Sequence, residues 1–78
     1  MTVATDGVHL VADDLDELHA FARRVGLRRE WFQDGPRPHY DLTTHRALER
    51  ALHAGAKRVS RRAAVRLARE AADALARI

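Results

Sequence analysis

The chain has 78 residues, a net charge of +3 and no cysteine. This length allows one domain with a thin hydrophobic core, which we place over residues 1–78. Without cysteine the chain can form neither a disulfide framework nor a thiolate zinc site. No apolar run approaches the ~18 residues of a membrane span, and the start of the chain does not resemble a signal peptide. We therefore expect a cytoplasmic protein without a membrane partner.

Charge is unevenly distributed along the chain. Residues 1–27 carry five acidic and two basic residues, whereas residues 57–78 carry seven basic and two acidic residues, a local charge of +5. A basic segment of this kind favours an anionic partner, such as a nucleotide or a nucleic acid.

The first predicted elements are a strand and a helix. The apolar run VHLVADD over residues 8–14 is typical of a strand, in which His9 and Val11 point to the same side. Asp14 can cap the following helix, and Gly26 can end it. Its apolar stripe comprises Leu15, Leu18, Ala22 and Val25, with Phe21 beside it.

The next segment contains two predicted short strands, RREWFQ and HYDL. The turn sequence DGPRP joins them, because its prolines belong in a loop rather than in a strand interior. The same segment holds the single Trp and the single Tyr of the chain. We expect Trp31, Phe32 and Tyr40 to anchor the core rather than to form a platform for a ligand.

A second helix is predicted from about residue 44 to residue 54. Thr43 would cap it, and Leu42 would lie just before the helix and pack on Ala47. Residues 54–56 (AGA) end this helix, and KRV at residues 57–59 forms a short extended segment.

Ser60 is predicted to cap the last and longest helix. Its two sides differ in character: Ala64, Leu67, Ala68, Ala71, Leu75 and Ile78 are apolar, whereas Arg62, Arg66, Arg69 and Arg77 lie opposite. Together these elements predict an α+β fold in which three helices pack on a small short-stranded sheet.

His39 and Asp41 are the first candidates for chemistry. Residues two apart in a strand point the same way, so the carboxylate would lie near the imidazole. Such a pair fixes the histidine tautomer, as general acid–base catalysis or phosphate binding requires. The alternative is that Asp41 only caps the second helix and that His39 is an exposed loop residue.

Three histidines from separate elements form a possible metal site. If the strand with His9 packs beside the helix with His19, both imidazoles could converge with His39. Asp13 or Asp41 would complete a site for zinc or another first-row ion. The spacing matches no metal-binding signature, and the alternative for His19 is a hydrogen-bonded residue of the core. A divalent metal is the one cofactor that the sequence indicates.

Arg61 and Arg62 occupy the first turn of the last helix, where the helix dipole disfavours cations. An anion bound there by the helix amides, Ser60 and both guanidinium groups would reverse this penalty. The alternative is an arginine-rich helix face that contacts only solvent.

The ordered motifs HLVADD, ELH, WFQ and HYDLT resemble those of a small bacterial and phage family of unknown function. The resemblance covers about residues 9–62. The positions that match the family motifs are His9, Asp13, His19, Trp31, His39, Tyr40, Asp41 and Arg46. Members of the family that this chain resembles typically begin with a strand that ends in paired aspartates. This chain has Asp6 alone at that place. That departure favours a binding function over an enzymatic one.

Three functions are consistent with these features. The first is a small binding module for a phosphate-bearing ligand, a nucleotide or nucleic acid. Its candidate residues are His9, His19, Trp31, His39, Tyr40, Arg46, Arg61 and Arg62. The second is a metal-assisted phosphodiesterase or nuclease-like enzyme, with metal ligands among His9, His19, His39 and Asp41, the last two being the catalytic candidates. The third is a structural or protein-partner domain, including a homo-oligomer formed through the last helix.

Overall fold

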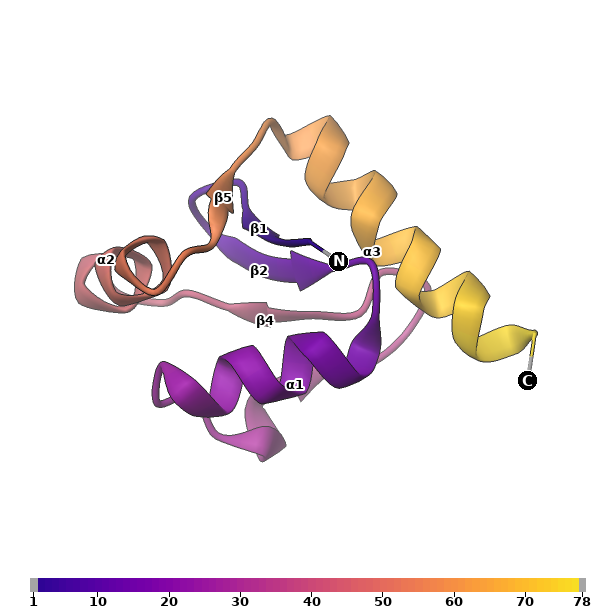
Figure 1. Cartoon of the computed structure of the whole chain (residues 1–78), viewed down its shortest axis with the longest axis horizontal. Helices are drawn as coiled ribbons and strands as arrows, with labels where there is room; N and C mark the ends of the chain where they lie inside the picture. Colours follow the sequence, from indigo (N-terminus) through magenta and orange to yellow (C-terminus); the bar gives the residue numbers. More distant parts are fainter. Residues whose placement is uncertain (1, 78) are drawn as a thin grey trace.

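The computed structural model describes residues 2–77, and these residues form an α+β fold, as the sequence predicts. Three α-helices pack against a mixed sheet of five short strands (Figure 1). In chain order the elements are β1 (Val3–Thr5), β2 (His9–Ala12), α1 (Leu15–Arg24), the 3₁₀ helix η1 (Arg29–Trp31), β3 (Phe32–Gln33), β4 (His39–Asp41), α2 (His45–His53), β5 (Lys57–Arg58) and α3 (Arg61–Ala76). No helix within residues 2–77 is long and apolar enough to cross a membrane.

The strands are arranged in the order β3-β4-β2-β1-β5. All neighbours are antiparallel except β1 and β5, which run parallel. The register places His9 opposite Asp41 and Leu10 opposite Tyr40, while Gln33 of β3 lies opposite His39. These pairings decide which side chains meet on each face of the sheet.

Helices α1 and α3 cover opposite faces of the sheet (Figure 1). Because side chains alternate along a strand, Leu10 and Ala12 of β2 pack toward α1, whereas Val11 packs toward α3. The core is therefore divided into two layers, one on each side of the sheet.

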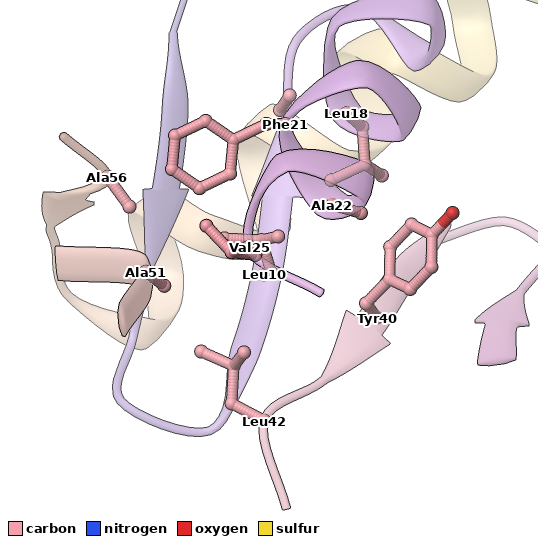
Figure 2. Packing of buried hydrophobic residues seen from close by; sticks show 10 residues of the cluster. Leu10, Leu18, Phe21, Ala22, Val25, Tyr40, Leu42, Ala51 and Ala56 are labelled. Atoms are coloured by element: carbon pink, nitrogen blue, oxygen red, sulfur yellow. The ribbon is translucent and has the colours of Figure 1, made fainter. Parts of the chain in front are cut away.

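The larger layer lies between α1 and the sheet. Figure 2 shows the Tyr40 ring beside Leu18 and Ala22 of α1, and all three are almost completely buried. Phe21 and Val25 complete the helix stripe that the sequence predicts. Burying such side chains contributes about 1.5–3 kcal/mol each, which is large for a domain of this size.

Local signals at the ends of α1 are confirmed. The Asp14 side chain accepts a hydrogen bond from the Glu17 backbone N–H, and the chain leaves the helix through Gly26 at φ +86°. A left-handed residue at this position favours glycine, because a Cβ atom would strain the backbone.

Helix α2 begins one residue later than the sequence predicts. Its cap is Thr44, whose extended backbone allows the side-chain oxygen to accept from the Ala47 N–H at 3.0 Å. Thr43 precedes the cap by one residue, so its side chain is too far from the first turn to play this role.

Helix α3 is capped by Ser60, as predicted, and Ala64, Ala68 and Ala71 form its buried stripe. Leu75, expected on this apolar side, is 56% exposed, because the last turns of α3 extend beyond the sheet (Figure 1). Ile78, the other residue expected there, lies outside the described residues.

The segment before β3 differs from the expected strand. Residues 29–31 form a 3₁₀ turn, and the strand itself is only two residues long. The turn directs Trp31 outward, so that this residue is 50% exposed instead of anchoring the core, whereas Phe32 packs against the core. Strand β1 was not among the predicted elements.

Candidate functional site

Three potential metal ligands meet on the face of the sheet that carries α3. His9 lies opposite Asp41 in the β2–β4 ladder, and His39 precedes Asp41 by two residues on the same strand. The His39 Nε2 atom lies 3.2 Å and the His9 Nε2 atom 4.0 Å from Oδ1 of Asp41. One ligand atom from each of the three residues lies within 4.8 Å of the others. We call these residues the His9–His39–Asp41 triad.

The far nitrogen of each imidazole is held by an oxygen that can only accept a hydrogen bond. Nδ1 of His9 lies 2.9 Å from Oδ2 of Asp6, and Nδ1 of His39 lies 2.7 Å from the backbone carbonyl oxygen of Arg37. Both Nδ1 atoms must therefore carry the hydrogen and donate it. In the neutral rings this leaves the lone pairs on Nε2.

The two Nε2 atoms, with their lone pairs free, lie 3.2 and 4.0 Å from the same carboxylate oxygen. Three electron-pair donors that converge in this way repel one another unless a cation lies between them or Nε2 is protonated. The rings themselves are packed edge to face, with centroids 5.0 Å apart, which limits their rotation. A positive charge between the three residues would relieve this repulsion.

Gln33 orients the carboxylate of the triad. Its side-chain nitrogen donates a hydrogen bond to Oδ2 of Asp41, leaving Oδ1 to face the imidazoles. Gln33 reaches this position because β3 pairs with β4 on the outer side of the sheet. Such outer contacts fix the direction of a metal-binding carboxylate.

Asp6 orients His9 from the loop between β1 and β2. Its carboxylate also accepts hydrogen bonds from the backbone N–H groups of Val8 and His9, and its side chain is 7% exposed. Burial raises the pKa of Asp6, but the hydrogen bonds from His9 and Val8 outweigh this effect and lower the pKa to about 2. Asp6 is therefore charged at neutral pH.

A hollow of about 190 Å³ lies beside the triad, between α3 and the sheet. Its walls contain Asp6, His9 and His39, and its apolar lining comes from Val11, Ala64, Val65 and Ala68. Arg37 and Arg61 also line the hollow, so that two basic residues lie next to the triad. This combination suits a small anion that also touches a metal ion.

His19, expected to join the other imidazoles, lies away from the triad, on the α1 side of the sheet. Its Nδ1 atom lies 2.8 Å from the hydroxyl oxygen of Tyr40, and its ring packs edge to face on Phe32. Burial lowers the pKa of His19, and the nearby Arg29 lowers it further. Burial also raises the pKa of Tyr40, which is only 1% exposed.

The remaining residues expected to bind the ligand are spread over three places. Trp31 lines a second hollow, which is bordered by Asp41 and Gln33. Arg62 lies on α3 next to Arg61 and lines a groove along that helix. Arg46 lines a separate hollow between α1 and α2, away from the triad.

Three residues of the site were not expected from the sequence: Asp6, Gln33 and Arg37. Gln33 reaches Asp41 through strand pairing, and Arg37 contacts His39 through its backbone carbonyl. A residue pattern reveals neither kind of contact. Asp6 did leave a signal, because it is the single acid that precedes the His-Leu strand.

Comparison with known proteins identifies the family but not a function. No curated protein and no solved structure matches the chain. A family model described as "Protein of unknown function (DUF4031)" matches residues 4–71, a range that includes the triad, Asp6, Gln33 and Arg61. The chain therefore belongs to the DUF4031 family.

Proposed function

We propose that the protein holds a divalent transition-metal ion between His9, His39 and Asp41 and uses it to bind a phosphate-bearing ligand. The observation that supports this proposal is the hydrogen bonding of both Nδ1 atoms to acceptors. It leaves the lone pairs of two Nε2 atoms free beside one carboxylate oxygen. Metal-binding histidines characteristically donate their other N–H to a carboxylate or a carbonyl oxygen.

The ligand set indicates the kind of metal. Two imidazoles and one carboxylate suit zinc, iron(II) and related first-row ions, whereas magnesium and calcium prefer oxygen ligands. Ligands about 2.0–2.2 Å from a tetrahedral ion lie roughly 3.3–3.6 Å from one another. The separation of 3.2 Å between His39 Nε2 and Asp41 Oδ1 lies just below this range, and a small rotation of His9 would shorten its 4.0 Å separation from Asp41.

The surroundings of the triad favour phosphate as the group that the metal binds. Three protein ligands leave at least one coordination position for an outside oxygen atom. Arg37 and Arg61 line the adjacent hollow and can bind the other phosphate oxygens. The apolar lining of Val11 and Ala68 lowers the local dielectric and so strengthens these contacts.

Hydrolysis of a phosphodiester is a second candidate function, favoured by the same three-ligand arrangement. An ion held by His9, His39 and Asp41 would supply a Lewis acid that activates water as a nucleophile. The water oxygen would form a bond to phosphorus while the ester P–O bond breaks. The water proton passes to solvent, and the leaving oxygen takes up a proton from solvent. Arg37 and Arg61 would stabilise the charge that develops on the phosphoryl oxygens.

Metal binding is tested by calorimetric titration of the metal-free protein with zinc and by the absorption spectrum of the cobalt(II) form. The wild type should bind one ion, whereas His39→Ala and Asp41→Asn should each lose most of the affinity. His53→Ala provides the matched control, because His53 is exposed on α2 and lies outside the triad. Equal zinc binding by all four proteins would refute the proposal.

Phosphate binding and hydrolysis are then tested on the zinc-loaded protein. Inorganic phosphate should bind and should bind more weakly to Arg61→Ala. Release of nitrophenol from bis-nitrophenyl phosphate would establish hydrolysis, provided that His39→Ala abolishes it. Phosphate binding without turnover would indicate a binding function without hydrolysis. Metal binding without any phosphate effect would contradict the choice of ligand.

A further inference from the structure

The basic face of α3 begins at the hollow beside the triad. Arg61 lines that hollow together with His9 and His39, and it also lines a groove along α3. The other basic residues of this groove are Arg62, Arg66 and Arg69. A positively charged surface therefore continues from the proposed metal site along the outside of α3.

Three arginines of this groove have no polar side-chain contact with the part of the chain that the structure describes. Among residues 2–77, no ion pair or side-chain hydrogen bond involves Arg62, Arg66 or Arg69, and all three are exposed. Because Arg62, Arg66 and Arg69 are four and three residues apart, they share one helix face and repel one another. A sequence that keeps such a repulsive arrangement is consistent with an anionic partner.

The dimensions of the groove match a polynucleotide backbone. Arg62 and Arg69 are seven residues apart, or roughly 10 Å along a helix that rises about 1.5 Å per residue. A nucleic-acid strand advances about 3.4 Å per nucleotide in B-form geometry, so the groove spans on the order of three phosphates. Glu70 and Asp73 border the groove beyond Arg69 and mark its end.

A second hollow, which contains Trp31, adjoins the triad at Asp41. Asp41 and Gln33 border the hollow that contains Trp31, Phe32 and Leu27. The Trp31 side chain is 50% exposed, which is unusual for the largest apolar residue of a small domain. An exposed aromatic ring beside a phosphate site can bind an unpaired base by stacking.

We infer that the phosphate-bearing ligand is a single-stranded nucleic acid whose backbone follows α3 from Arg69 to Arg61, with one phosphate at the metal and an adjacent base on Trp31. A duplex fits less well, because its bases are already paired and stacked and cannot cover the indole ring. The placement of one phosphate rests on the proposed metal function, whereas the contacts of α3 and Trp31 do not.

The single Trp gives a direct measurement, since all indole fluorescence of the chain comes from this residue. An oligothymidylate of about twelve nucleotides, within the site size of small single-strand binding domains, should quench this fluorescence on binding. A duplex of the same length should bind more weakly and quench less. Quenching by the duplex at equal affinity would overturn the assignment of a single strand.

The role of α3 is tested by Arg66→Ala/Arg69→Ala. Each lost phosphate contact reduces the slope of log K against log salt by about 0.7 for a single strand, so the double variant should lose about 1.4. The matched control, Arg23→Ala/Lys57→Ala, removes the same charge from exposed residues that line neither the α3 groove nor the two hollows next to the triad. An equal loss of affinity in both variants would reduce the effect to net charge and overturn the inference.

Two further measurements separate this inference from the proposed function. Arg66→Ala/Arg69→Ala should retain zinc and inorganic phosphate binding. If the wild type binds zinc and inorganic phosphate but no oligonucleotide, the inference is overturned and the metal site stands. If zinc does not bind, the proposed function and the placement of one phosphate fall together. Poly-glutamate of matched charge tests an acidic protein partner; binding as tight as that of oligothymidylate would overturn the choice of nucleic acid.

Discussion

Nδ1 of His9 lies 2.9 Å from the Asp6 carboxylate, and this contact fixes the direction in which the other ring nitrogen points. Asp6→Asn should therefore weaken zinc binding by about 10–100-fold, the usual cost of losing such an outer partner. The Asn amide can donate to Nδ1 and so stabilise the wrong tautomer, while its oxygen can still accept the backbone hydrogen bonds.

Competition with a chromogenic zinc chelator measures this change in affinity. Asp34→Asn is the control, because Asp34 is exposed in the loop before Gly35 and lies outside the site. If Asp6→Asn binds zinc as tightly as the control does, Asp6 does not orient His9 toward a metal.

Tyr40→Phe should distinguish the contributions of the two faces of the sheet to stability and to zinc binding. The Tyr40 hydroxyl is hydrogen-bonded to His19 on the α1 side, whereas its neighbours in β4, His39 and Asp41, belong to the triad on the other side. Removing one buried hydrogen bond should lower the free energy of unfolding by about 1 kcal/mol without changing zinc affinity. Urea unfolding and zinc titration of the same preparation measure both quantities. A loss of zinc binding would show that His19 and Tyr40 support the triad.

The pH dependence of stability should contain a contribution from His19. Burial lowers its pKa in the folded state below the value of about 6.5 expected in the unfolded state. The unfolded chain then binds this proton more readily. The stabilising contribution of neutral His19 to the free energy of unfolding is therefore fully present above about pH 6.5. It is lost as the pH falls from there through the lower folded pKa.

Comparing His19→Gln with the wild type across this pH range isolates the effect, because the other four histidines are common to both proteins. The difference in the free energy of unfolding should shift in favour of the variant as the pH falls. A difference that stays constant with pH would contradict the lowered pKa.

Two leucines at opposite extremes of exposure test the packing. Leu18 is 0% exposed in the core, whereas Leu75 near the end of α3 is 56% exposed. Leu18→Ala should reduce the free energy of unfolding by about 2–5 kcal/mol, while Leu75→Ala should change it by less than about 0.5 kcal/mol. A large effect at Leu75, accompanied by a change in molecular mass by light scattering, would instead indicate self-association through α3.

The sequence predicts best those features that depend on neighbouring residues. The cap at Asp14, the end of α1 at Gly26 and the cap at Ser60 are confirmed, because each depends on a few residues in contact along the chain. The cap of α2 was misplaced by one residue, since Thr43 and Thr44 carry the same side chain. The three-residue strand β1 has too little alternation to be recognised alone.

The site depends on contacts that the sequence does not encode locally. The spacing of His39 and Asp41 predicts that they share a face, and the structure places them 3.2 Å apart. His9 joins them through the register of β2 and β4, whose residues are about thirty positions apart in the chain. His19 shows the limit of the same reasoning: its helix covers the other face, so it could not meet the other histidines.

Helix α3 meets the sheet through Ala64 and Ala68, and side chains this small hold its axis close to the strands. Both alanines also border the hollow beside the triad. A larger side chain in place of either methyl group would increase the distance between α3 and the sheet. Evolution could thus adjust the size of the hollow through substitutions in α3, while His9, His39 and Asp41 stay unchanged.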